Sequence, residues 1–410
     1  MLNKVKNKTE FYNYNPEWET EAEKTIKLLK TIFGENAPDI RHIGGTAVKK
    51  IKSRPVIDIA VGLNSMNSIE LFMGVLKTHG FFCDLNRSNT AKKIFYKYGE
   101  RNKTHIVYVM LHQSKLWFDY LVFRDYMNIS DGKAREYENL KLSVNGKYRS
   151  ALPSYIKLKS DFIKKTVSDN FYAMMLGKNV AVKLDLENFN NYPKLNDAVY
   201  PLISGYIKNF EHKAYIIGVY DYNMPDEFNG KIIAYINNGG DKIFIAAKEN
   251  MIFYEPEIYE AVKFMINGAC NPEIKCLYEK SCGAVIYTKD RGEIKFLLVR
   301  GRASNRVGFP KGHIEKDENE TETAIREIYE ETSLNVVLYS DFKEEYGYTV
   351  NGYIKKTVVY FLAEFNVSDK YKFFDMEILE QRLVPYEKAY QMLTFSQDKT
   401  VLKKAFEKIK

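Results

Sequence analysis

Apolar and polar residues alternate along much of this chain, and the period of the alternation changes from one part to the next. Residues 56–61 are apolar except for Asp58, as is typical of a buried strand. From about residue 173 to residue 266, short alternating stretches are separated by turns that contain Gly, Asn and Asp. Residues 254–266 end this segment with a helical period. The patterns predict one early strand and then an all-β segment that closes with a helix.

The last part of the chain mixes strand and helix periods. Strands are predicted at residues 281–288, 295–300, 343–350 and 354–365. Turns at 290–292 and at Asn351-Gly352 join these strands in pairs. The other expected elements are a helix at 321–332, an acidic loop at 373–382, and one or two helices within 386–409. This order favours an α/β/α sandwich, in which helices cover both faces of a sheet.

Length and composition set wide limits on the fold and its partners. A chain of 410 residues is expected to hold about two to four domains, because one core rarely grows beyond ~250–300 residues. The net charge of +8 suits a small anionic substrate if the excess lines a cleft. Nothing in this balance indicates a nucleic-acid partner, although it does not exclude one.

Cysteines and apolar stretches point to the cytoplasm. The four cysteines are Cys83, Cys270, Cys276 and Cys282. They form no CxxC pair, so reduced thiols are expected. The N-terminus lacks the apolar core of a signal peptide, and no apolar stretch approaches the ~20 residues that span a bilayer. We therefore expect a cytoplasmic protein with no membrane partner.

The predicted helix at 321–332 concentrates carboxylates. Glu327 and Glu331 are four residues apart on one face, and Glu330 lies beside them. Like charges at this spacing repel by ~0.2–0.5 kcal/mol per pair, so the face favours a bound cation. Carboxylate oxygens are suited to Mg²⁺ or Mn²⁺. A solvated acidic helix that binds nothing is the alternative interpretation.

The two ends and the apolar side of this helix are also predictable. Asn319, followed three residues later by Glu322, is a plausible N-terminal cap. Ser333 falls directly after the helix, where a left-handed backbone is easiest for glycine. The apolar residues expected to pack against a sheet are Ala324, Ile325 and Ile328.

Six positions in this region resemble the Nudix box, with Ser333 where that family usually has glycine. They are Gly312, Glu318, Arg326, Glu327, Glu330 and Glu331. Together with residues 281–285, 308–315 and 382–395, they make residues 279–410 resemble the asymmetric diadenosine tetraphosphate hydrolases. The resemblance implies a Nudix sandwich that cleaves a phosphoanhydride bond, releasing ATP and AMP from diadenosine tetraphosphate.

The same resemblance implies roles for individual residues. Mg²⁺ (or Mn²⁺) would be held by Glu327, Glu330 and Glu331, with the Gly312 carbonyl as a further ligand. Arg326 would orient the glutamates through an ion pair. The candidates for the general base are Glu331, Glu377 and Glu380.

Substrate contacts are less specific. Arg300, Arg302 and Lys311 are candidates for polyphosphate contacts, and each could equally be a solvated charge. Tyr353, together with Tyr346 and Tyr348, could stack on an adenine or could pack a sheet face. Nucleoside triphosphates, ADP-ribose and triphosphorylated RNA ends stay open as other Nudix substrates.

Residues 1–168 resemble the GrpB family, a branch of the α+β nucleotidyltransferase fold. The resemblance rests on residues 15–18, on Gly44-Gly45 before the strand that carries Asp58, and on residues 121–126. Active transferases have a second carboxylate two residues further on, where this chain has Ala60. The residues that could form a phosphate pocket are Arg41, His42, His105 and Arg124. A nucleotide-sensing domain that is the main site of the protein, a structural module and an active transferase all stay open.

Residues 173–266 contain a segment, residues 200–207, that resembles the YPxxYGYI element of soluble inorganic pyrophosphatases. The resemblance implies a small β-barrel. Lys213 falls where a metal-binding aspartate would be needed, and its charge opposes metal binding. We expect a barrel without pyrophosphatase chemistry, and a role in homo-oligomer formation is left open.

Overall fold

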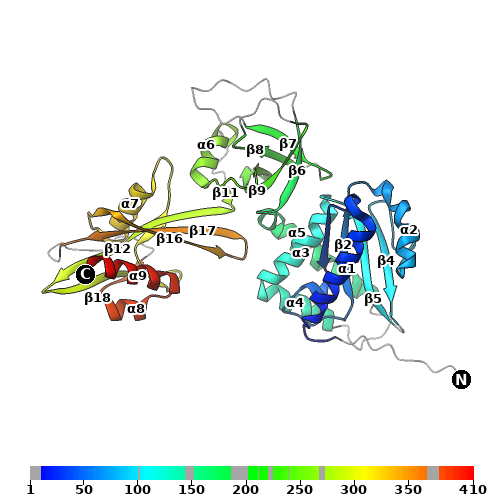
Figure 1. Cartoon of the computed structure of the whole chain (residues 1–410), viewed down its shortest axis with the longest axis horizontal. Coiled ribbons are helices and arrows are strands. Elements are labelled where there is room, and N and C mark those ends of the chain that lie inside the picture. Colours follow the sequence, from blue (N-terminus) through cyan, green and yellow to red (C-terminus); the bar gives the residue numbers. More distant parts are fainter. Residues whose placement is uncertain are drawn as a thin grey trace. The chain divides into compact units, whose positions relative to one another are not determined.

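The chain divides into two compact units. The computed structural model describes residues 11–99, 102–143, 152–185, 202–210, 212–219, 225–238, 240–266, 273–366 and 378–410. The first unit comprises residues 1–235 and 241–249, and the second comprises residues 236–240 and 250–410 (Figure 1).

A five-stranded sheet forms the centre of the first part of the first unit. Its strands lie in the order β1-β2-β5-β4-β3, with β2 and β5 parallel and the other neighbours antiparallel. The strands are β1 (Asp39–Ile43), β2 (Ile57–Leu63), β3 (Phe81–Cys83), β4 (Lys92–Tyr98) and β5 (Lys103–Leu111). The helices are α1 (Glu17–Phe33), α2 (Ile69–Thr78), α3 (Lys115–Ile129), α4 (Asp131–Leu142) and α5 (Leu152–Met175). The predicted early strand is β2.

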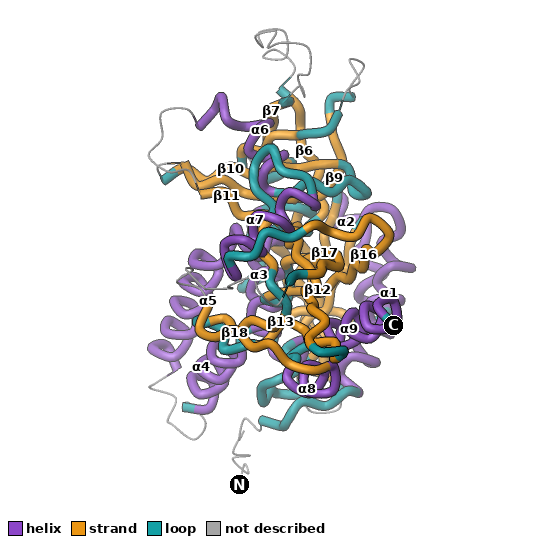
Figure 2. Tube along the Cα trace, turned by 90° about the vertical axis from the view of Figure 1, so that its left-hand side faces the viewer, coloured by secondary structure: helices purple, strands orange, loops and turns teal. Residues whose placement is uncertain are grey.

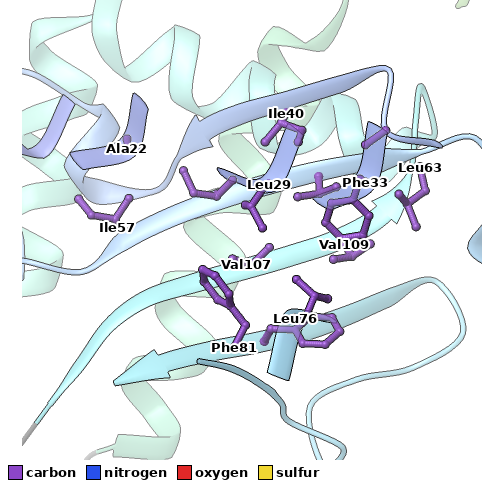
Figure 3. Packing of buried hydrophobic residues seen from close by; sticks show 14 of the residues in the cluster. Ala22, Leu29, Phe33, Ile40, Ile57, Leu63, Leu76, Phe81, Val107 and Val109 are labelled. Atoms are coloured by element: carbon purple, nitrogen blue, oxygen red, sulfur yellow. The ribbon is translucent and has the colours of Figure 1, made fainter. Parts of the chain in front are cut away.

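The two faces of this sheet differ in character. Side chains alternate along β2, so Ile57, Ile59, Val61 and Leu63 all enter one apolar core, while Asp58 lies on the opposite face. Figure 3 shows α1 and α2 residues packed against Val107 and Val109 of β5 in this core. The opposite face contacts α3, which in turn contacts α4 and α5, and Figure 2 shows these three as neighbouring helices.

A small five-stranded barrel completes the first unit. Its strands are β6 (Asn179–Leu184), β7 (Ile203–Ile207), β8 (Lys213–Ile216), β9 (Glu227–Asn238) and β10 (Asp241–Ala247). They lie in the order β10-β8-β7-β6-β9, and a pairing of β10 with β9 closes the barrel. The predicted all-β character is confirmed, although the residues from 186 to 201 lie outside the described part of the chain.

The second unit is built on a seven-stranded sheet. Its path is β14-β13-β12-β17-β16, with β15 paired to β12 and β18 paired to β13. The strands are β12 (Tyr278–Asp290), β13 (Glu293–Gly301), β14 (Val307–Gly308), β15 (Lys311–His313), β16 (Val337–Val350), β17 (Ile354–Glu364) and β18 (Ile378–Pro385). The other elements are α6 (Glu255–Ile266), β11 (Glu273–Cys276), α7 (Glu320–Thr332), α8 (Tyr386–Met392) and α9 (Ser396–Ile409).

Helices cover both faces of this sheet, as predicted. Ala324 and Ile328 of α7 are buried in one core, and α8 and α9 supply residues such as Ala389 and Leu402 to the other. Figure 1 shows α7 on one side of the sheet and α8 and α9 on the other. No described helix combines the length and the apolar character needed to cross a membrane.

Two predictions about the second unit were wrong in detail. Residues 373–382 were expected to form an acidic loop, but from Ile378 onward they belong to β18, where Ile378 to Arg382 pair with Gly301 to Leu298 of β13. Residues 373–377 lie outside the described part of the chain. Ile325 was expected in the core, but 40% of its surface is exposed, because its position on α7 points away from the sheet.

Candidate functional site

A capping box starts α7 and so fixes where its carboxylates lie. The Asn319 side chain accepts hydrogen bonds from the backbone N–H groups of Thr321 (2.9 Å) and Glu322 (3.0 Å). The Glu322 carboxylate accepts from the Asn319 backbone N–H at 2.8 Å. These reciprocal bonds satisfy donors that a helix start leaves unpaired. The helix therefore begins within one residue of the predicted start, and the predicted cap is confirmed.

Arg326 holds three glutamates of the predicted motif together. Its Nη1 donates to Glu327 Oε1 at 2.7 Å and to Glu330 Oε2 at 3.1 Å. Its Nε and Nη2 both donate to the Glu318 carboxylate, the latter at 2.9 Å. Nη2 also donates to the backbone carbonyl of His313 at 2.8 Å. The planar guanidinium therefore holds these three carboxylates close to one another.

The carboxylates in this cluster have different electrostatic environments. Hydrogen bonds from Arg326 lower the pKa of Glu318 to about 2. Burial raises the pKa of Glu327, and the charge of Glu330 adds to the rise despite the opposing Arg326. Glu318 is thus a stable anion that anchors the arginine, whereas the ionised form of Glu327 is disfavoured by its surroundings.

Gly312 has a clear steric reason to be glycine. It lies in β15, where it pairs with Cys282 of β12, and the Glu327 carboxylate packs directly over it. A Cβ atom at Gly312 would lie 2.0 Å from the Glu327 carboxyl carbon. The glycine at the start of the motif therefore lets the α7 carboxylate approach the backbone of β15.

Glu331 lies on the same side of α7, nearer to the sheet. It is 8% exposed, and its carboxylate accepts a hydrogen bond from the Lys311 backbone N–H at 3.2 Å. Glu327 and Glu331 thus both face β15, as the spacing of four residues predicts. This places a carboxylate at the point where α7, β15 and the adjoining pocket meet.

The donor set of α7 fits a hard divalent cation in its chemistry. Three carboxylates from one helix face are suitable ligands for Mg²⁺ or Mn²⁺, and a cation would relieve the disfavoured charge of Glu327. Arg326 engages one oxygen each of Glu327 and Glu330. Among the described residues, no three His, Cys, Asp or Glu side chains are already gathered in a metal-holding cluster. The carboxylates of Glu327 and Glu330 are therefore on the helix face but are engaged by Arg326.

A pocket of about 570 Å³ opens beside Glu331. Aromatic side chains line it: the ring centroids of Tyr346 and Tyr348 are 6.1 Å apart, and those of Tyr348 and Phe395 are 6.3 Å apart with a tilt of 30°. The Arg306 guanidinium lies 5.1 Å from the Phe395 ring centroid. Flat faces of this kind suit a planar base.

Cations and one buried carboxylate also line this pocket. Its basic residues are Arg306, Lys311 and Lys356. Burial lowers the pKa of Lys356, and the neighbouring charge of Lys311 lowers it further. Asp398 of α9 is 1% exposed and accepts a hydrogen bond from the Tyr346 hydroxyl at 2.7 Å. Burial raises the pKa of Asp398.

The predicted substrate contacts separate into two groups. Lys311, Tyr346 and Tyr348 line the pocket. Arg300, Arg302 and Tyr353 are not among its lining residues. Arg300 pairs with Glu380 at 3.3 Å, and Arg302 donates to the Ile378 carbonyl at 3.2 Å, so both contact β18.

The two alternative bases have different outcomes. Glu380 is held by Arg382 and Arg300, and the hydrogen bond from Arg382 lowers its pKa. Glu377 lies outside the described residues. Of the three predicted candidates, Glu331 is therefore the carboxylate that the structure places at the pocket.

Some pocket residues were missed in the sequence. Asp398 has the helical spacing of the buried residues Val401, Leu402 and Ala405. A carboxylate on the apolar side of a helix could have been identified from the sequence as a candidate pocket residue. Arg306 and Lys356 carried no comparable signal, because only the pairing of the strands brings them to one pocket.

The structure brings together only part of the phosphate pocket expected in the first unit: Arg124 Nη1 donates to the His42 backbone carbonyl at 3.0 Å. Arg41 pairs with Asp39 at 2.7 Å, and Arg124 pairs with Asp125 at 2.7 Å. His105 lies near Glu21 of α1, at 3.5 Å. His105 pairs with Ile57, so it shares the α1 face of the sheet, whereas Asp58 lies on the other face. The register of β5 therefore separates this histidine from Asp58.

Comparisons with known proteins identify both ends of the chain. Residues 8–169 match the family described as GrpB protein, and residues 277–405 match the NUDIX domain. Neither match extends over residues 170–276, so the pyrophosphatase resemblance of the middle segment stays a prediction, as does the nucleotidyltransferase resemblance of the first.

Three curated relatives give the degree of similarity. The glutamate-rich protein GrpB of Alkalihalophilus pseudofirmus is 32% identical over 173 residues, which cover 41% of this chain and 99% of that protein. UPF0157 protein YqkA of Bacillus subtilis is 27% identical over 176 residues. These residues make up 43% of this chain and about half (51%) of that protein. The asymmetrical bis(5'-nucleosyl)-tetraphosphatase of Rattus norvegicus is 30% identical over 140 residues, which cover 31% of this chain and 93% of that protein.

Proposed function

Since the chain belongs to the GrpB family through residues 8–169 and to the Nudix family through residues 277–405, we propose that it hydrolyses a phosphoanhydride bond of a nucleotide. The proposed substrate is a dinucleoside polyphosphate, with diadenosine tetraphosphate cleaved to ATP and AMP. One observation carries the proposal: Arg326 orients the α7 carboxylates beside a pocket that has both aromatic faces and cations. The similarity to an asymmetrical bis(5'-nucleosyl)-tetraphosphatase supports this substrate class.

Each pocket feature matches one part of such a substrate. Tyr346, Tyr348 and Phe395 offer faces on which a base can stack. Lys311 and Lys356 line the same pocket as these faces and Glu331, and their positive charge suits a polyphosphate. The substrate would therefore run from the aromatic end of the pocket to the carboxylates of α7.

The carboxylates would hold the metal and handle the proton. Glu327, Glu330 and Glu331 would hold Mg²⁺ or Mn²⁺ with the Gly312 carbonyl, and the bound ion would neutralise phosphate charge and activate water. Arg326 keeps Glu327 and Glu330 in position through hydrogen bonds to one oxygen of each. Glu331, at the pocket edge, is the proposed acceptor of the proton from water.

The test is a substrate panel on the full chain with Mg²⁺, scored by product identity. The panel contains diadenosine tetraphosphate, nucleoside triphosphates, ADP-ribose and triphosphorylated RNA. We expect ATP and AMP from the first compound. Glu330→Gln should abolish turnover, by a factor of at least about 100, because it keeps the shape but removes a charged ligand. Glu407→Gln on α9 is the matched control, since Glu407 is an exposed carboxylate far from the motif in sequence.

The panel distinguishes the substrate from the chemistry. Turnover of another nucleotide in place of dinucleoside polyphosphates would keep the Nudix chemistry and reject the substrate. Equal activity in Glu330→Gln and in the wild type would reject the role of the α7 carboxylates. No metal-dependent turnover of any compound in the panel would reject the proposal as a whole.

A further inference from the structure

The sheet face that lies away from α1 and α2 carries an unusual set of polar side chains. Asp58 of β2 pairs with Ile106, Tyr108 of β5 pairs with Ile94, and Tyr96 of β4 pairs with Ile106. Directly paired residues point to the same face, and so do residues two apart on one strand. Asp58, Tyr108 and Tyr96 therefore share one face, and the strand alternation of β4 adds Lys92 to it.

Hydrogen bonds organise this face. The Lys92 Nζ donates to the Tyr120 hydroxyl of α3 at 3.1 Å and lies 5.6 Å from the ring centroid of Tyr108. The Arg87 Nη1 donates to the Tyr96 hydroxyl at 2.6 Å, and the Tyr108 hydroxyl donates to Asp58 Oδ1 at 3.5 Å. Cationic groups thus contact the tyrosines near Asp58, and the Asp84 carboxylate also interacts with Tyr96.

The Gly44-Gly45 turn and Lys141 of α4 lie near the same cluster. A Cβ atom at Gly44 would lie 2.2 Å from Asp58 Oδ2, and one at Gly45 would lie 2.3 Å from Ser53 Oγ. Lys141 of α4 is 6% exposed and donates to Ser53 Oγ at 3.0 Å and to the Lys52 carbonyl at 2.6 Å. The turn is therefore pressed against Asp58, and Lys141 secures the adjoining loop.

Two further cations interact electrostatically with Asp58. Arg54 and Lys159 both act on the Asp58 carboxylate, and neither forms an ion pair among the residues that the structure describes. Both also act electrostatically on Lys141. Lys159 comes from α5, so the cluster draws on both the sheet and the helices.

Positive charge dominates this cluster. Its basic residues are Arg54, Arg87, Lys92, Lys141 and Lys159. Burial lowers the pKa of Lys159, against the opposing charge of Asp58, and burial together with the charges of Lys159 and Arg54 lowers the pKa of Lys141 to about 7. Three nearby acids have other partners: Glu138 accepts from the Lys52 backbone N–H, Asp119 pairs with Lys115, and Asp84 accepts from the Asn86 and Arg87 backbone N–H groups while also acting on Tyr96. Crowded cations of this kind are a cost to the fold that a bound anion would offset.

We propose that this cluster binds a small phosphate-bearing anion, such as a pyrophosphate or the phosphates of a nucleotide, without a metal ion. Arginine and lysine are the side chains that recognise phosphate oxygens, and within the described part of the chain Arg54 and Lys159 form no ion pair as short as 4 Å. Asp58 is the only carboxylate on this part of β2, and one carboxylate holds Mg²⁺ poorly. The site is separate from α7, so it stands independently of the proposed hydrolase activity.

The test is calorimetric titration of the full chain with inorganic pyrophosphate, and then with ATP, in the presence of EDTA. We expect binding that Lys159→Met weakens at least about tenfold, since a phosphate contact is lost. The thermal midpoint of Lys159→Met should stay level or rise, because the variant removes the cost of burying a charge. Lys24→Met on the exposed side of α1 is the matched control and should bind as the wild type does.

Asp58→Asn gives a result of opposite sign. Asparagine keeps the shape of the side chain and an acceptor for the Tyr108 hydroxyl. It removes the negative charge that repels phosphate, so binding of pyrophosphate should tighten by a few-fold. If Asp58 were a metal ligand, the same variant would abolish binding and the wild type would need Mg²⁺; either outcome would overturn the proposal.

Controls assign the signal to this cluster. Lys311→Met, in the Nudix pocket, should leave metal-free pyrophosphate binding unchanged. Loss of binding in that variant would place the anion in the second unit and overturn the proposal. So would unchanged binding in Lys159→Met, or no binding of either probe by the wild-type chain.

Discussion

Two clusters in this molecule have opposite charge arrangements. On α7, a single arginine, Arg326, lies among the carboxylates of Glu318, Glu327 and Glu330. On the sheet of the first unit, a single carboxylate, Asp58, lies among lysines and arginines. A phosphate needs a cation between it and the α7 carboxylates, whereas the basic cluster provides the positive charge itself. The two clusters therefore predict opposite metal requirements, which the variants below test.

The clusters also differ in how far their charges are paired. Arg326 uses its whole guanidinium, with hydrogen bonds to three glutamates and to the His313 carbonyl. Arg54 and Lys159 form no ion pair within the described residues. The charges of the α7 cluster are thus paired with one another, whereas the basic cluster contains cations that can pair with a bound anion.

The largest expected effect comes from breaking the α7 pairing. Arg326→Gln leaves three glutamates without their common partner, so we expect turnover to fall by roughly 100-fold or more and the free energy of unfolding to fall by about 3 kcal/mol. Initial rates and denaturant unfolding measure the two effects. Arg382→Gln is the control, because Arg382 pairs with the exposed Glu380. Metal-free pyrophosphate binding should be unchanged, and a loss of it would connect two clusters that we treat as independent.

A smaller change separates geometry from charge at the same site. Gly312→Ala places a Cβ atom against the Glu327 carboxylate, which is the mobile end of a side chain and can rotate away. We expect turnover to fall by about 10–100-fold, while the free energy of unfolding changes by less than about 1 kcal/mol. Gly347→Ala is the control, because its new Cβ would meet the Lys356 carbonyl at an ordinary 3.7 Å. Wild-type turnover in Gly312→Ala would show that the position of Glu327 does not matter.

The basic cluster predicts a pH effect on stability. Burial raises the pKa of Asp58 from 3.8 to about 6, so its contribution to stability is fully present below pH 3.8 and is lost as the pH rises through 6. Asp58→Asn lacks this loss. Its free energy of unfolding, relative to the wild type, should therefore rise between pH 4 and pH 7 by about 2 kcal/mol and then level off.

Several buried histidines, His42 among them, have lowered pKa values and are common to both proteins. Burial lowers the pKa of His42 to about 4, which reduces stability as the pH falls below 6.5. His42 is present in both proteins, so its contribution cancels in the difference. Denaturant unfolding at several pH values measures that difference, and a value independent of pH would contradict the buried ionisable carboxylate.

Local rules predicted the α7 cluster well from the sequence. The cap at Asn319, the face shared by Glu327 and Glu331, and the left-handed Ser333 all depend on residues within a few positions of one another. The pairing of Arg326 with Glu330 follows from their spacing of four residues. The sandwich also followed from the order of periodic segments, because each segment carries its own period.

The basic cluster and the pocket could not be predicted in this way. Arg87 and Lys159 are far from Asp58 in sequence, and only the pairing of β4, β5 and β2 with the packing of α5 brings them together. The sequence instead suggested His105, which the register of β5 sends to the other face. Strand β18 was missed for a related reason, since its acidic residues gain their structure from pairing with β13.

The smallest expected effect comes from a change that alters neither charge arrangement. Ser333 ends α7 with φ 59° and ψ 19°, and its N–H donates to the Tyr329 carbonyl at 2.7 Å. Glycine relieves the strain that a Cβ atom causes in this left-handed backbone, which favours the folded state. It also loses more chain entropy on folding, which offsets part of that gain. The net effect of Ser333→Gly should be a rise of about 0.5–1 kcal/mol in the free energy of unfolding. Asn351→Gly is the control, because Asn351 is also left-handed, at φ 51°, but asparagine tolerates this backbone better and should gain less. Turnover and pyrophosphate binding should not change in either variant. A clear change of turnover in Ser333→Gly would mean that the backbone at the end of α7 positions Glu330 and Glu331. The two clusters would then differ in backbone geometry as well as in charge.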